Sequence, residues 1–103
     1  MSLVSSDAAK RYRRNGAIVI DVRGPDEYAS GHLPGSVNVP LGELTGTISK
    51  GLPGQNRIIL LHCLGGGRSR MAASTLKSLG YTNAYKFGSY SRAEGILSGE
   101  QDK

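Results

Sequence analysis

The only cysteine of the chain, Cys63, stands in a segment whose composition favours a reactive sulfur. An apolar-rich run precedes it, three glycines at positions 65–67 follow it, and Arg68 closes the segment. Glycines let successive backbone N–H groups turn toward one point, and a helix that opens at Ser69 adds the partial positive charge of its N-terminus. These groups and Arg68 favour the thiolate, which is the nucleophilic form of cysteine. The pattern therefore predicts that Cys63 is a catalytic nucleophile beside an anion site.

The residues after Cys63 are candidates for binding an anionic substrate. Arg68 ends the loop, where its guanidinium can donate two parallel hydrogen bonds to an oxyanion. Arg70, further into the predicted helix, is either a second anion contact or a solvated cation. The backbone amides of the loop complete the predicted cradle, and they belong to Leu64, Gly65, Gly66, Gly67 and Ser69.

Asp21 and Arg23 form a second group of candidates, at the end of an apolar run. They could take part in catalysis, but we prefer an ion pair or hydrogen-bonded set that braces the cysteine loop. We expect Glu27, which follows shortly, to pair with backbone groups or with an arginine near this segment.

The two histidines are weaker candidates for a general base. His32 stands between glycine and Leu-Pro, where a histidine more often packs or hydrogen-bonds within a turn. His62 precedes Cys63 directly, so in a continuous strand the two side chains point to opposite faces. We therefore do not expect a Cys–His dyad.

Apolar runs and helical patterns alternate along the chain, which indicates an α/β fold with a largely parallel sheet. Ligands bind outside the carboxyl ends of such strands, so Cys63 and the Asp21–Arg23 segment are expected on one rim. The predicted strands cover 17–22, 36–39, 57–62 and 83–87. The first predicted helix begins near Ser5–Asp7 and stops at Gly16, and the others cover 26–30, 43–49, 69–79 and 90–97.

Length and cysteine content limit the possible organisation. The 103 residues fit a single domain over 1–103, with a core at about 6–97 and a polar tail at 98–103. A lone cysteine excludes an internal disulfide and a zinc site built from several thiolates. No run of about 18 apolar residues is present, so we expect no membrane partner. No signal peptide is visible, which favours the cytoplasm, or the periplasm if a leader has been removed.

The net charge of +5 raises the question of a nucleic-acid partner. The densest basic cluster, at 10–14, falls at the end of a predicted helix, where it complements the helix dipole as a solvated turn. The chain carries no nucleic-acid motif. We therefore expect no nucleic-acid binding, and a charge that concentrates small anions.

Two long segments resemble the rhodanese-like domain family. The first comprises Asp21-Val22-Arg23, Glu27-Tyr28 and residues 31–40, and the second is the active-site loop from Cys63 to Arg68. A third segment, 79–83 with Gly88 beyond it, resembles the family's sequence after the loop. The resemblance implies a single rhodanese domain with a central five-stranded parallel sheet flanked by helices. It also implies sulfur transfer through a cysteine persulfide, as in one-domain sulfurtransferases named for thiosulfate or for the phage-shock response.

From these observations we expect a sulfurtransferase that moves sulfur from thiosulfate or a related small anionic donor to cyanide, a small thiol or a protein acceptor. We expect a monomer that needs no metal and no organic cofactor. One rival is a phosphatase or arsenate reductase on the same fold. The phosphotyrosine phosphatase motif places five residues between its cysteine and its arginine, whereas four residues separate Cys63 from Arg68. The other rival is a non-enzymatic binding or sulfur-carrier module that keeps Cys63.

Overall fold

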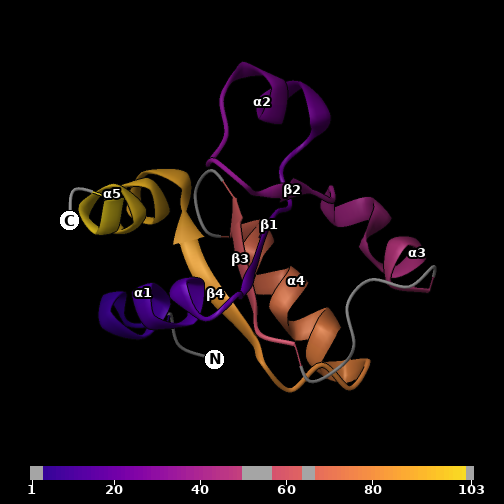
Figure 1. The fold of residues 1–103 in the computed structure, drawn as a ribbon. Helices are drawn as coiled ribbons and strands as arrows, with labels where there is room; N and C mark the ends of the chain where they lie inside the picture. The colour runs from indigo at the N-terminus through magenta and orange to yellow at the C-terminus, as the bar shows by residue number, and fades with distance from the viewer. Residues whose placement is uncertain (1–3, 50–56, 64–66, 102–103) are drawn as a thin grey trace.

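Strands and helices alternate along the chain, as the sequence predicts. The computed structural model describes residues 4–49, 57–63 and 67–101. Figure 1 shows a central sheet with helices on both faces and a short helix, α2, beyond one end. In chain order the elements are α1 (Ser6–Arg14), β1 (Ile18–Asp21), α2 (Pro25–Ser30), β2 (Val37–Asn38), the 3₁₀ turn η1 (Leu41–Glu43), α3 (Leu44–Ser49), β3 (Ile59–Cys63), α4 (Gly67–Ser78), β4 (Ala84–Ser89) and α5 (Tyr90–Gln101).

The sheet is parallel throughout and has the strand order β2-β1-β3-β4. Its register places Asp21, the last residue of β1, beside Asn38 of β2 and His62 of β3. The carboxyl ends of these strands therefore meet at one rim, which is where ligands bind in open parallel sheets. The predicted common rim for the Asp21–Arg23 segment and the cysteine is confirmed.

The sheet has four strands over the described residues, whereas the family resemblance implied five. Beside the outer edge of β4, the Val4 N–H donates to the Lys86 carbonyl with an N···O distance of 2.9 Å. A strand needs a ladder of such bonds along consecutive residues, so this contact ties the N-terminal segment to the edge without adding a strand.

Two apolar clusters lie on opposite faces of the sheet, because successive side chains of a strand alternate between its faces. Figure 1 shows α1 and α5 over one face and α4 over the other. The cluster under α3 and α4 includes Ile20, Ile59, Leu61, Cys63, Leu44, Ala72, Ala73 and Leu76. The cluster under α1 and α5 includes Val19, Leu60, Phe87, Ala9, Ala93 and Ile96.

Helix boundaries differ from the sequence prediction most clearly in α4 and α5. Helix α4 starts at Gly67 and ends at Ser78, whereas we predicted 69–79, and Leu79 is 39% exposed. Gly80 follows with φ at +95°, a conformation that suits glycine at the end of a helix. Helix α5 continues to Gln101, past the predicted end at Leu97.

Helix α2 differs from the others in that none of its residues is buried. Pro25 occupies its first turn and Gly31, with φ at +156°, follows its last residue, so local sequence sets both ends. Its position over the rim depends on polar contacts described below. Among the described helices, none is both long and apolar enough to cross a membrane.

Candidate active site

Cys63 is the last residue of β3 and its side chain is buried, with 1% exposed. The Ser69 backbone N–H, in the first turn of α4, donates to the Cys63 Sγ at 3.3 Å. The sulfur therefore lies at a helix N-terminus, where the helix dipole and an N–H group stabilise negative charge. The predicted arrangement of strand, cysteine and helix is present.

The other predicted loop residues are placed only in part. Gly67 is the exposed first residue of α4, Ser69 is buried, and Arg70 is exposed on the outer side of the helix. The cradle amides predicted for Leu64, Gly65 and Gly66 lie outside the described residues.

Arg68 forms a two-pronged ion pair with Glu27 of α2, over a sequence separation of 41 residues. Its Nη1 and Nη2 donate to Glu27 Oε1 and Oε2 at 2.7 and 2.9 Å, and Oε1 also accepts the Gly24 N–H at 3.0 Å. The Arg68 hydrogen bonds, followed by the Gly24 N–H, lower the pKa of Glu27 from 4.5 to about 2, and the same carboxylate raises the pKa of Arg68. The guanidinium fork that we predicted for a substrate anion is thus engaged by a carboxylate.

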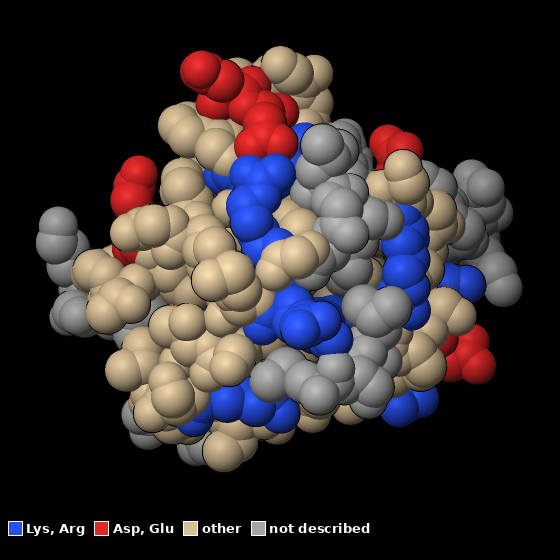
Figure 2. Space-filling model, turned by 180° about the vertical axis from the view of Figure 1, so that it is seen from behind, with Lys and Arg blue, Asp and Glu red and all other residues tan. Residues whose placement is uncertain are grey.

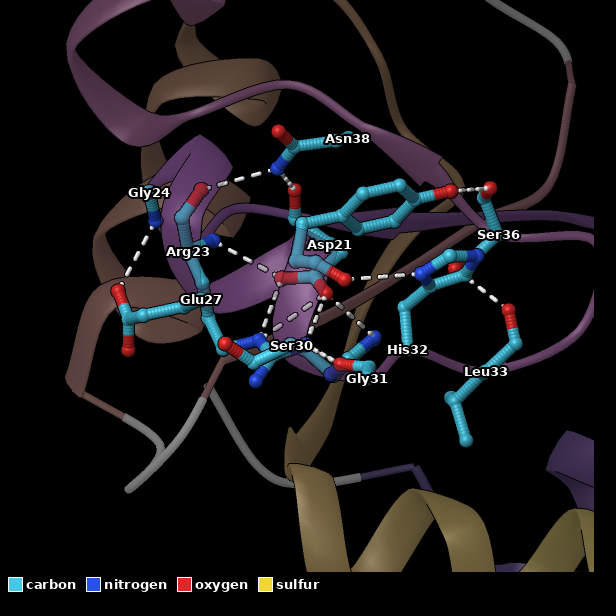
Figure 3. Close-up of polar contacts among 12 residues, drawn as sticks. Asp21, Arg23, Gly24, Glu27, Ser30, Gly31, His32, Leu33, Ser36 and Asn38 are labelled. Carbon is cyan, nitrogen blue, oxygen red and sulfur yellow. Dashed lines mark hydrogen bonds and ion pairs between the residues drawn. The ribbon is translucent and has the colours of Figure 1, made fainter.

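Asp21 and Arg23 form a buried ion pair at the end of β1 (Figure 3). The Asp21 carboxylate accepts hydrogen bonds from the Arg23 backbone N–H at 2.9 Å, from Nε at 3.0 Å and from Nη2 at 2.8 Å. Arg23 Nη2 also donates to the Gly31 carbonyl at 2.7 Å. Because Gly31 follows α2, this arginine ties the end of α2 to its beginning.

Comparison with known proteins assigns the chain to a family. The profile of the rhodanese-like domain family matches residues 5–91. The chain belongs to this family. It is 35% identical over 69 residues to the thiosulfate sulfurtransferase PspE of Escherichia coli K12, an alignment that covers 67% of this chain and 66% of PspE. It is 40% identical over 63 residues to the putative sulfur carrier protein YrkF of Bacillus subtilis, covering 61% of this chain and 33% of YrkF.

A solved structure, the human single-domain sulfurtransferase TSTD1, superposes with a TM-score of 0.79 at 26% identity, covering 92% of this chain and 96% of that one. The likeness over nearly the full length of both chains supports the assignment of the fold. The match to curated relatives is narrower, since the chain spans two thirds or less of PspE and YrkF.

Asn38 is a supporting residue of this rhodanese-like domain that the sequence analysis did not select. Its Nδ2 donates to the backbone carbonyls of Asp21 at 3.0 Å and Arg23 at 2.9 Å (Figure 3). It thus holds the backbone on both sides of Val22. The available signal was an amide residue between two valines in a short strand, which does not by itself reveal the carbonyls it binds.

Neither histidine of the rhodanese-like domain forms a dyad with Cys63. His62 is buried, its Nε2 lies 3.7 Å from Asp21 Oδ2, and burial lowers its pKa. Strand alternation directs His62 away from the cluster that contains Cys63. His32 is exposed, and its Nδ1 donates to the Tyr28 carbonyl at 2.9 Å. Its ring stacks on that of Tyr28, with the two ring centroids 3.8 Å apart. His32 therefore packs within a turn, as the sequence favoured.

Proposed function

We propose that the protein is a rhodanese-type sulfurtransferase that carries sulfur as a persulfide on Cys63. The observation that carries this proposal is the contact between the Cys63 Sγ and the Ser69 N–H at the start of α4. A thiolate at this position is stabilised by the helix N-terminus, and the same helix N-terminus suits the terminal sulfur of a persulfide, which is also anionic. The relative PspE bears the name of a thiosulfate sulfurtransferase, which supports the same reaction class.

The reaction proceeds in two displacements. The Cys63 thiolate attacks the outer sulfur of thiosulfate, a new S–S bond forms, the S–S bond of thiosulfate breaks, and sulfite leaves with the electron pair. Cyanide or a thiolate then attacks the terminal sulfur of the persulfide, and thiocyanate or a new persulfide leaves. Cys63 returns as the thiolate, so no net proton transfer and no redox partner is required.

The remaining site residues have supporting roles in this proposal. The Ser69 N–H holds the anionic sulfur together with the amides that the sequence predicts for Leu64 to Gly67, and Arg68 is a cation that also binds Glu27. Asp21 and Arg23 brace the rim, and Arg70 offers a second positive charge at the start of α4.

A sulfur-carrier or binding role is a second candidate, because YrkF is named as a putative sulfur carrier. Both roles use the persulfide, but a carrier delivers it to one dedicated acceptor. Turnover with cyanide and several small thiols favours the enzyme, whereas loading without release to any of them favours the carrier. The phosphatase rival is disfavoured by the four-residue spacing between Cys63 and Arg68.

Intact-mass spectrometry tests the shared step directly. Thiosulfate should add about 32 Da, the mass of one sulfur atom, and cyanide or a reductant should remove it. Cys63→Ser, the matched control, should show no addition while circular dichroism reports an unchanged fold. An unchanged mass in the parent protein, or equal addition in the serine variant, would refute the persulfide on Cys63.

A further inference from the structure

We propose that Glu27 is a specificity-determining residue, which sets how strongly the site binds anionic sulfur donors by sharing the guanidinium of Arg68. This inference rests on the proposed function for its biological meaning. It concerns a measurable property of the site, namely its affinity for an anion such as thiosulfate.

Arg68 and Glu27 are joined by two parallel hydrogen bonds. A guanidinium has five N–H groups, and the two prongs from Nη1 and Nη2 to Glu27 use two of them, which leaves the others available to a substrate. The carboxylate is itself held by the Gly24 N–H at 3.0 Å, so it is fixed to the start of α2 as well as to Arg68. An anion that approaches Arg68 therefore meets a cation whose charge is already paired with the Glu27 carboxylate.

Both partners of the Arg68–Glu27 pair are charged. Arg68 holds the pKa of Glu27 near 2, so the carboxylate stays ionised at every pH at which the protein would work. The hydrogen bonds to Glu27 in turn raise the pKa of Arg68, so both partners of the pair stay charged. Glu27 therefore offsets at the donor site much of the attraction that Arg68 alone would exert.

Basic side chains are prominent on one face of the molecule (Figure 2). Figure 2 shows Lys and Arg side chains across the middle of one face, with acidic side chains at its edges and directly against a basic one at its upper edge. On a chain of net charge +5, a carboxylate that binds Arg68, the residue before the Ser69 N–H that contacts the reactive sulfur, weakens anion binding near the N-terminus of α4. Such a site discriminates less strongly in favour of anionic donors over uncharged ones.

Thiosulfate binding in the Cys63→Ser background tests this inference without requiring sulfur transfer. Glu27→Gln keeps one acceptor oxygen for the Gly24 N–H and Arg68 Nη1 but removes the charge and the acceptor for Nη2, and it should tighten thiosulfate binding about two- to fivefold, the range for exposed ion pairs. Asp26→Asn removes the same charge from the neighbouring exposed residue of α2 and should leave affinity unchanged. Affinities come from amide shifts in an NMR titration at low and high salt, and the gain should shrink in high salt.

Arg68→Ala supplies the second half of the test. It removes the cation and also leaves Glu27 as an uncompensated negative charge, so it should weaken thiosulfate binding. Adding Glu27→Gln to Arg68→Ala should recover part of the loss, whereas a purely structural role for the pair predicts that the double variant binds no better than Arg68→Ala. Equal affinities in the parent and Glu27→Gln, or no binding by any variant, would overturn the inference. Altered affinity without sulfur addition in the Cys63 protein would overturn the proposed function alone.

Discussion

Replacing Asp21 by asparagine should strongly destabilise the fold, because Arg23 would be left as a buried cation without its carboxylate. Asp21 has no exposed surface and Arg23 is 4% exposed, so water cannot replace the lost charge. Breaking a buried, hydrogen-bonded ion pair costs about 3–5 kcal/mol. This is a large part of the roughly 5–15 kcal/mol that stabilises an ordinary domain.

Urea unfolding followed by far-UV circular dichroism measures this loss, since the chain has no tryptophan for a fluorescence signal. With an m-value of about 1.5 kcal/mol/M, the midpoint should fall by about 2–3 M urea. Asp26→Asn removes an exposed carboxylate from α2 and should change the free energy of unfolding by less than about 0.5 kcal/mol.

The double variant Asp21→Asn/Arg23→Gln separates the charge effect from simple loss of contacts. It leaves no charge buried at this position, so it should be more stable than Asp21→Asn alone by about 1 kcal/mol or more. If Asp21→Asn costs less than about 1 kcal/mol, or if the two single losses simply add, the buried pair does not stabilise the rim in the way we describe.

Two further predictions concern the pair on α2 and the length of the loop. The pKa of Glu27 is lowered from 4.5 to about 2, so its contribution to stability is complete above pH 4.5 and disappears as the pH falls from 4.5 toward 2. The difference in Tm between the parent and Glu27→Gln should therefore be constant at neutral pH and shrink in that acidic window, and a difference that does not vary with pH would contradict the assignment. Inserting one glycine between Gly67 and Arg68 should abolish sulfur addition from thiosulfate, because a wider cradle fits a tetrahedral oxyanion better than a single sulfur. Parent-like loading by that variant would show that loop length does not select sulfur.

Much of the fold was predictable because glycine and proline mark the ends of the elements. Gly80 stops the helix after Cys63, and Pro25 with Gly31 brackets α2, and each of these signals is local. The residues predict four strands, and the sheet has four over the described part of the chain, whereas the fifth strand was implied only by the family resemblance. The backbone contact from Val4 to Lys86 beside β4 depends on tertiary geometry, so no local signal predicts it.

In the candidate site, too, the features set by neighbouring residues were predictable and the contact between distant residues was not. The thiol at the start of a helix follows from neighbouring residues, and the predicted ion pair between Asp21 and Arg23 is present, although the contact that Arg23 makes beyond it is with the Gly31 carbonyl after α2. Glu27 was expected to find a backbone group or an arginine and it binds both, but its arginine is Arg68, 41 residues away. A single sequence holds no information on which of the many carboxylates a distant cation will meet.

The absence of any buried side chain on α2 gives this helix a thermodynamic independence from the core. Local opening requires only the free energy of the contacts that break, and an element without apolar burial opens far more often than the whole domain unfolds. The contacts that break here include those of Arg68 with Glu27, of Arg23 with the Gly31 carbonyl and of the Tyr28 hydroxyl with the Ser36 carbonyl. Each opening would uncouple Arg68 from its carboxylate while the sheet stays intact. We therefore expect two electrostatic forms of one site, and a molecule that docks on α2 would change the balance between them.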